Sequence, residues 1–248
     1  MSHYPSFFIE AHLDGGLLNG DIIGAEYFRS DLKKHLKSRR IARNEKVEFL
    51  NGSGLRIIAQ CEDPQTFRYR ILEIKKEAEI VPYIELCLPL IKQDLLSEAL
   101  SQATEIGVSR IRWIRSEHDQ VPKGLKKIPF ERAERIAQAA IEQCARPWTI
   151  SIDHDWTDIS SLLENSEYEK VVADENLANK NFLGFSTEQS LEISKKVLLF
   201  IGPEGGWSQN ERQAFDSAKV HFLSLGNLVL RVPTAIVSAV FFLRLRNS

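Results

Sequence analysis

The stretch that decides the fold is Val197-Leu-Leu-Phe-Ile-Gly-Pro-Glu-Gly-Gly-Trp-Ser208. Its first residues are all apolar and predict a buried strand of a parallel sheet. The following turn packs three glycines, a proline and an acid into five residues, which is more than a plain turn requires. Ser208 and Glu211 then form the S-x-x-E pattern that begins a helix. Because open α/β sheets bind ligands where parallel strands end, we expect a ligand site at this loop.

A second strand and loop follow at Phe222-Leu-Ser-Leu-Gly-Asn-Leu-Val-Leu-Arg-Val-Pro-Thr-Ala235. Pro233 suits the first turn of a helix, because early helical N–H groups have no partner within the helix. The residue before a proline favours an extended backbone, so we expect Val232 outside the helix. We expect the two strand ends to be neighbours that face one ligand. Arg231 would then form a structural ion pair, or hold a phosphate or an oxyanion.

The class of ligand is narrowed by what the glycine-rich loop does not contain. A nucleoside triphosphate site needs a lysine at the head of the helix, where this chain has Trp207. The glycine spacing also differs from a dinucleotide fingerprint and from a hydrolase nucleophile elbow. Of the ligand classes considered, a nucleoside-like ligand without a polyphosphate tail is the one that this loop still fits. Replacing Gly202 by valine is expected to fill the ligand space and to leave the fold intact.

Two domains are expected from a change of pattern near residue 78. Residues 1–77 hold a hairpin, in which strands around 46–50 and 55–61 flank a turn at 51–54, and read as a small, mainly antiparallel β domain. Residues 78–248 alternate short apolar strands with amphipathic helices, which is typical of a parallel α/β sheet. The expected helices there include 93–106, ending at Gly107, and one that begins near Pro129 and runs to Arg146.

A basic segment lies in the first domain, between Arg29 and Lys46. It holds eight cations and two acids, although the whole chain has a net charge of −2. Such a run is either a solvated helix face or a surface that contacts RNA phosphates. The residues proposed for RNA binding are Lys33, Lys34, Arg39, Arg40 and Arg43.

The composition excludes several classes of protein. With 248 residues, 43% hydrophobic and 27% charged, the chain is neither disordered nor fibrous. Its apolar runs are too short to cross a membrane, and its first residues do not resemble a signal peptide. We therefore expect a cytoplasmic protein without membrane contact.

Cysteines and acidic clusters give no sign of a metal. Cys61, Cys87 and Cys144 are widely spaced, which suits reduced thiols in the core. Glu117-His118-Asp119 and Asp153-His154-Asp155 are expected to be solvated loops, because neither has a second cluster of ligands at helical spacing. We expect no metal.

Five motifs, in order along the chain, carry a resemblance to a known family. Lys34-His35-Leu36 lies in the basic segment, and Ser97–Val108 and Ile136–Arg146 lie in two of the expected helices. The fourth and fifth motifs are the two loops, Ile201–Ser208 and Leu223–Arg231. Together they resemble the ribosomal RNA small subunit methyltransferase E family, uridine N3 methyltransferases of the SPOUT superfamily.

This resemblance implies a PUA-like β-barrel domain followed by a SPOUT-type α/β domain with a C-terminal trefoil knot, working as a homodimer on ribosomal RNA of the small subunit. It implies S-adenosyl-L-methionine as cofactor, with the loop after Ala173 as a third wall of its site. The cofactor-binding residues implied are Phe200, Ile201, Gly202, Pro203, Glu204, Gly205, Gly206, Leu225, Gly226, Asn227 and Leu230.

The implied reaction is methylation of N3 of a uridine in 16S ribosomal RNA. N3 must lose a proton, and a fixed cation would stabilise the charge on the flanking carbonyl oxygens. Arg231 is the expected cation, and Glu204 is either the base or a cap for its loop. Two positions depart from the family pattern: Val232-Pro233 replaces Thr-Glu, and Gln102 replaces a lysine. The alternatives are an RNA-binding paralogue with weak or no catalysis, and a methyltransferase for a different RNA base.

Overall fold

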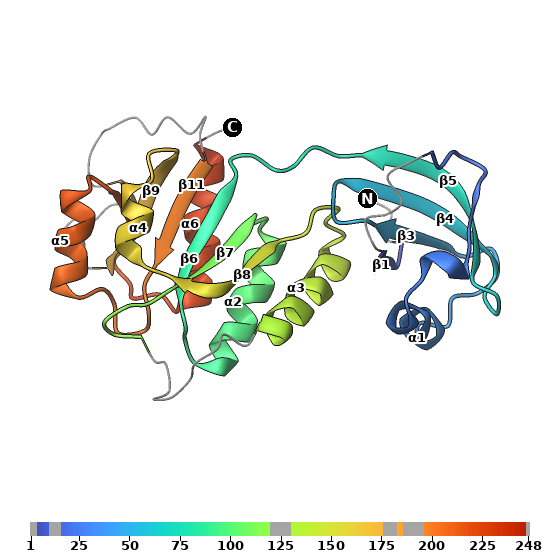
Figure 1. Ribbon diagram of the computed structural model, residues 1–248, viewed down its shortest axis with the longest axis horizontal. Helices are drawn as coiled ribbons and strands as arrows, with labels where there is room; N and C mark the ends of the chain where they lie inside the picture. Colours follow the sequence, from blue (N-terminus) through green and yellow to red (C-terminus); the bar gives the residue numbers. More distant parts are fainter. Residues whose placement is uncertain (1–3, 10–15, 120–129, 176–182, 186–195, 247–248) are drawn as a thin grey trace. The chain divides into compact units, whose positions relative to one another are not determined.

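The computed structural model describes residues 4–9, 16–119, 130–175, 183–185 and 196–246 (Figure 1). The chain divides into two compact units. The first comprises residues 1–79 and 138–149, and the second comprises 80–137 and 150–248. Residues 138–149 thus join the first unit although they lie far beyond the change of pattern in the sequence.

The first unit is built on a five-stranded mixed sheet in the order β1-β3-β4-β5-β2. β1 pairs parallel with β3, and the other pairs are antiparallel. The elements are β1 (Ser6–Phe8), β2 (Ile22–Ile23), the short 3-10 helix η2 (Ala25–Tyr27), α1 (Ser30–Ser38), β3 (Lys46–Leu50), β4 (Leu55–Asp63) and β5 (Arg68–Lys76).

The predicted hairpin is confirmed as β3 and β4. Asn51 shapes its turn, because its side-chain oxygen accepts hydrogen bonds of 2.9 Å from the N–H groups of Ser53 and Leu55. Gly54 adopts a positive φ of 94° there, a conformation that favours glycine. Behind the sheet, Leu32 and Leu36 of α1 join an apolar core rich in aromatic rings.

The second unit is built on a seven-stranded sheet in the order β10-β12-β9-β11-β6-β7-β8. Every pair is parallel except β10 with β12, so the predicted parallel α/β sheet is confirmed. The strands are β6 (Ile84–Pro89), β7 (Arg110–Ile114), β8 (Ser151–Thr157), β9 (Tyr168–Ala173), β10 (Leu183–Phe185), β11 (Lys196–Ile201) and β12 (His221–Leu225).

Helices cover both faces of this sheet (Figure 1). Apolar side chains of α2 and α6 pack with one face, and those of α4 and α5 pack with the other. The helices are α2 (Gln93–Glu105), α3 (Phe130–Cys144), α4 (Ile159–Glu164), α5 (Gln209–Ser217) and α6 (Val232–Leu245).

Two helix boundaries differ from the prediction. α3 ends at Cys144 and not at Arg146, because Ala145 has a positive φ of 54° that ends the helix; the predicted start at Pro129 lies outside the described residues. α6 survives as expected, but Val232 is inside it. The N–H of Ala235 donates to the carbonyl of Arg231 at 2.9 Å, so the first helical turn already encloses Val232.

Two further expectations from the sequence were wrong. Residues 153–155 lie in strand β8 at the edge of the sheet, where Asp153 pairs with Arg110 at 2.6 Å. An edge strand is covered less, so its apolar alternation is weak in the sequence. Cys61 and Cys87 are buried, but Cys144 is exposed at the end of α3.

Candidate functional site

Three strand ends meet at one edge of the second sheet. The neighbouring strands β12, β9 and β11 run parallel, so Leu225, Ala173 and Ile201 end on the same side. The two strand ends predicted to be neighbours are separated by β9, which corrects that expectation. The glycine-rich loop, the loop after β12 and the residues after β9 therefore surround a common space.

The glycine-rich loop is fixed at its helical end by the predicted capping box, which is confirmed. The hydroxyl of Ser208 accepts from the N–H of Glu211 at 3.1 Å, and the Ser208 N–H donates to the Glu211 carboxylate at 2.7 Å. Within the loop, the Gly206 N–H donates to the Pro203 carbonyl at 2.9 Å, and Gly206 has a positive φ of 68°. Hydrogen bonds within the loop and at the start of α5 therefore fix its conformation.

Trp207 ties this loop to the end of β9. Its indole N–H donates to the carbonyl of Ala173 at 3.0 Å, and its ring packs edge-on against Phe215, with the centroids 5.0 Å apart. A Cβ added at Gly202 would lie 3.1 Å from Cε2 of Trp207. A valine at 202 would thus press on a buried tryptophan, so we expect it to lower stability as well as to fill the ligand space.

The strand ends enclose a cavity of about 260 Å³. Its wall is mainly apolar. The lining residues are Leu95, Ala173, Asp174, Glu175, Ile201, Gly202, Pro203, Glu204, Gly206, Trp207, Leu225, Gly226, Leu228, Val229, Leu230, Arg231, Val232 and Ala235.

Most of the residues proposed for the cofactor line this cavity, and three do not. Phe200 points to the other face of the sheet, where it packs against Phe215 with ring centroids 5.3 Å apart. Gly205 lies against His118, since a Cβ there would be 3.0 Å from the Cβ of His118. Asn227 belongs to the loop after β12 but is not part of the wall.

An ion pair at the end of β9 was missed by the sequence reasoning. The buried carboxylate of Asp174 accepts two hydrogen bonds from Arg212 of α5, at 2.7 and 3.1 Å. These hydrogen bonds are the main reason that the pKa of Arg212 is raised. Asp174 and its neighbour Glu175 both line the cavity. The signal was weak, because acidic residues after an apolar strand are common at sheet edges.

Arg231 and Glu204 both line the cavity, and both contact α2. Nη2 of Arg231 lies 3.5 Å from Oε1 of Glu98. Oε1 of Glu204 accepts from the N–H of Lys92, the residue that precedes α2, at 3.5 Å. Arg231 therefore forms the ion pair that was one of its two expected roles. Its side chain is also 65% exposed, which leaves it accessible to an anionic group of a ligand.

The segment 117–119 is the solvated turn that was expected, with Glu117 and His118 exposed, and it also contacts the glycine-rich loop and its helix. Nδ1 of His118 lies 3.1 Å from the carbonyl of Gly206, and the Glu117 N–H donates to Glu211 at 3.1 Å. This segment therefore supports the glycine-rich loop from outside. No group of three or more potential metal-binding side chains occurs among the described residues.

The basic segment lies on and after α1 in the first unit. Lys34, Arg39, Arg40 and Arg43 are exposed, and Lys33 is half-buried. None of the five forms an ion pair with another described residue. Their charge is therefore open to an external partner.

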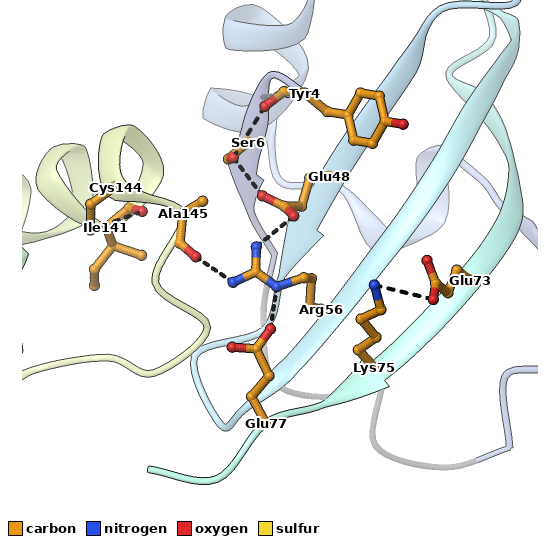
Figure 2. A network of polar contacts seen from close by, with 10 residues as sticks. All are labelled: Tyr4, Ser6, Glu48, Arg56, Glu73, Lys75, Glu77, Ile141, Cys144 and Ala145. Atoms are coloured by element: carbon orange, nitrogen blue, oxygen red, sulfur yellow. Dashed lines mark hydrogen bonds and ion pairs between the residues drawn. The ribbon is translucent and has the colours of Figure 1, made fainter. Parts of the chain in front are cut away.

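A groove of about 930 Å³ in the same unit has its charges largely paired (Figure 2). Arg56 pairs with both Glu48 and Glu77, and its Nη2 donates to the carbonyl of Ala145 at 2.8 Å. Burial alone would lower the pKa of Arg56, but the hydrogen bonds to the two carboxylates outweigh it and raise that pKa. The network therefore attaches the segment after α3 to the sheet.

Comparisons with known proteins show the family to which this chain belongs. Residues 78–244 match the RNA methyltransferase domain, and the chain belongs to that family. No helix within the described residues is long and apolar enough to span a bilayer.

Two proteins that are similar to this chain in sequence have the same name. The ribosomal RNA small subunit methyltransferase E of Rickettsia conorii is 27% identical over 217 residues, which cover 84% of each chain. The protein of that name from Synechocystis is 28% identical over 204 residues, covering 79% of this chain and 64% of the relative.

Solved structures share the fold over nearly the whole chain. The ribosomal RNA small subunit methyltransferase E of Neisseria gonorrhoeae, bound to S-adenosyl methionine, superposes with a TM-score of 0.79 at 23% identity and covers 98% of both chains. The protein Lpg2936 of Legionella pneumophila, in complex with the same cofactor, superposes with a TM-score of 0.76 at 21% identity and covers 98% of both chains.

Proposed function

We propose that this protein transfers a methyl group from S-adenosyl-L-methionine to N3 of a uridine in 16S ribosomal RNA. The observation that carries the proposal is the apolar cavity at three parallel strand ends, bounded by the glycine-rich loop, in a member of the RNA methyltransferase domain family. Relatives named ribosomal RNA small subunit methyltransferase E support the choice of RNA.

The residues present fit this cofactor. Leu95, Leu225 and Ala235 supply apolar walls that suit a nucleoside, and the cavity contains no lysine. A Cβ added at Gly226 would meet no atom within 4 Å, so the loop after β12 leaves room at that point. When bound, the cofactor supplies an activated methyl group on a sulfonium. The loops around Gly202 and Gly226 would hold it through their backbone.

The contribution of the protein is mainly alignment, because methyl transfer is an in-line displacement. Arg231 stabilises the negative charge that develops on the uridine carbonyl oxygens when N3 loses its proton. Glu204 has two candidate roles: it removes that proton, or it holds the loop against the N–H of Lys92. A Glu204→Gln variant with normal cofactor affinity and a large loss of kcat would favour the base, and weaker cofactor binding would favour the loop role.

We further propose the finer architecture that the family resemblance implies. The position of β12 beside β9, with α6 packed back into the core, supports a C-terminal trefoil knot. The mixed sheet with α1 supports a PUA-like first domain, with its boundary near residue 78. The exposed apolar side chains Phe241 and Leu245 on α6 support a homodimer, which light scattering would test.

The direct test is methyl transfer by the purified protein. It is incubated with labelled cofactor and unmodified small ribosomal subunits, and the RNA nucleosides are identified by mass spectrometry. We expect 3-methyluridine. A methylated base other than uridine would favour the alternative enzyme, and RNA binding without cofactor binding in calorimetry would favour the non-catalytic paralogue.

RNA contact by the basic segment is tested through the dependence of affinity on salt. The variant carries Lys34→Ala, Arg39→Ala and Arg40→Ala, and Lys219→Ala in the other unit is a control for loss of charge. Each lost phosphate contact should reduce the slope of log affinity against log salt by roughly 0.7 for single-stranded RNA. If the triple variant keeps the wild-type slope, the segment is a solvated face.

A further inference from the structure

None of the residues next to Arg231 in the sequence is acidic. Arg231 precedes α6 in an extended conformation, with φ −64° and ψ 151°, and the next two residues are Val232 and Pro233. Both are apolar and buried. A carboxylate that orients Arg231 must therefore come from another element.

That carboxylate comes from the middle of α2, a helix that packs against α6. Oε1 of Glu98 lies 3.5 Å from Nη2 of Arg231, and the Glu98 side chain is 38% exposed. Among the described residues, Glu98 is the acid that forms an ion pair with Arg231. Lys92, the residue that precedes the same helix, donates its N–H to Glu204. α2 and the residue before it thus contact both residues proposed for the chemistry.

Gln102 holds Glu98 from one turn further along α2. Its Nε2 donates to Oε1 of Glu98 at 3.3 Å, the same oxygen that faces Arg231. The amide must present its nitrogen, because its carbonyl oxygen would repel the carboxylate. A lysine at 102 would carry a full charge at the i+4 position, the favoured arrangement for a Glu–Lys pair on a helix. The neutral amide steadies Glu98 and leaves its charge for Arg231.

We propose that Glu98 is a positioning residue for Arg231 and that Gln102 fixes the carboxylate of Glu98. The carboxylate holds the guanidinium at the cavity wall, where it faces the oxygens of the acceptor base. Resting on the proposed function, this inference adds a residue outside both ligand loops. Glu98 is not among the residues that line the cavity, so in this proposal it acts through Arg231.

The test compares Glu98→Gln with a matched control on the same helix, Glu105→Gln. Glu105 is exposed and accepts a hydrogen bond from Ser101, one turn away on the same helix, at 2.7 Å. Exposed ion pairs are weak, so Glu98→Gln should lower kcat roughly 2- to 5-fold, with the cofactor dissociation constant and thermal stability unchanged. Gln102→Lys should lower kcat in the same direction, because the lysine draws the carboxylate away from Arg231.

A second arm separates positioning from a general effect on the helix. In an Arg231→Ala background, in which we expect only residual transfer, Glu98→Gln should have no further effect on kcat. Equal activity of the Glu98 and Glu105 variants overturns the proposal, and so does a loss of kcat that persists without Arg231. A wild-type protein that methylates no RNA overturns the proposed function itself, and a positioning role falls with it.

Discussion

Replacing Gly202 by alanine tests how closely the glycine-rich loop packs on Trp207. The new methyl carbon would lie 3.1 Å from Cε2 and 3.2 Å from Nε1 of the indole, closer than ordinary van der Waals contact. Trp207 cannot move away freely, because it is only 2% exposed, donates to Ala173 and packs on Phe215. The strain must therefore appear as lost stability.

Overpacking of a buried site costs about 1 to 3 kcal/mol. For a chain of about this size, each kcal/mol lowers Tm by roughly 2 to 4 °C. We therefore expect Gly202→Ala to melt roughly 2 to 12 °C below the wild type in a thermal scan. The cofactor affinity, measured by calorimetry below the melting range, should fall as well, because Gly202 lines the cavity.

A double-mutant cycle identifies Trp207 as the source of the strain. Trp207→Ala removes the ring that the alanine at 202 would crowd, so it should destabilise the Gly202→Ala protein by at least ~1 kcal/mol less than it destabilises the wild type. Additive effects, within about 0.5 kcal/mol, would refute the reasoning. The methyl group would then be accommodated by a shift of the loop and not resisted by the indole.

Asp174→Asn removes a charge that is 3% exposed and leaves Arg212 without its carboxylate, so the free energy of unfolding in urea should fall by about 3 kcal/mol. The control Asp216→Asn, at an exposed position of α5, should change that free energy by under about 0.5 kcal/mol. Equal losses in the two variants would contradict the ion pair. In the native protein at pH 8, a thiol reagent followed by peptide mass spectrometry should label Cys144 and spare Cys87. Burial raises the pKa of the Cys87 thiol, so the folded state keeps a proton that the unfolded chain loses near pH 9, and stability should fall as pH rises beyond that value. Labelling of Cys87 before Cys144 would contradict its burial.

Local patterns predicted the elements well where a short motif has a direct physical meaning. The capping box at Ser208 and Glu211 appears as predicted, because both hydrogen bonds join residues three apart. The Asn51–Gly54 turn likewise follows from one side chain and two glycines. Such features depend on neighbours in the sequence and need no knowledge of the fold.

Features that depend on distant partners could not be predicted in this way. Nothing near Leu225 in the sequence indicates that β9 lies between its strand and β11, since strand order is decided by packing of the whole sheet. The partner of Arg231 is more than one hundred residues away, on α2. Asp153 reads as part of a polar loop until Arg110, on the neighbouring strand, is placed beside it.

The strand order also has a consequence for synthesis of the protein on the ribosome. β6 pairs on one side with β7, which follows soon after it, but its other partner is β11, made only at residues 196–201. A nascent chain that ends before Lys196 therefore leaves the backbone edge of the mostly apolar strand β6 unpaired for the time needed to add more than one hundred residues. Chaperones that bind exposed apolar strands should recognise the growing chain in this interval and release it once β11 has paired.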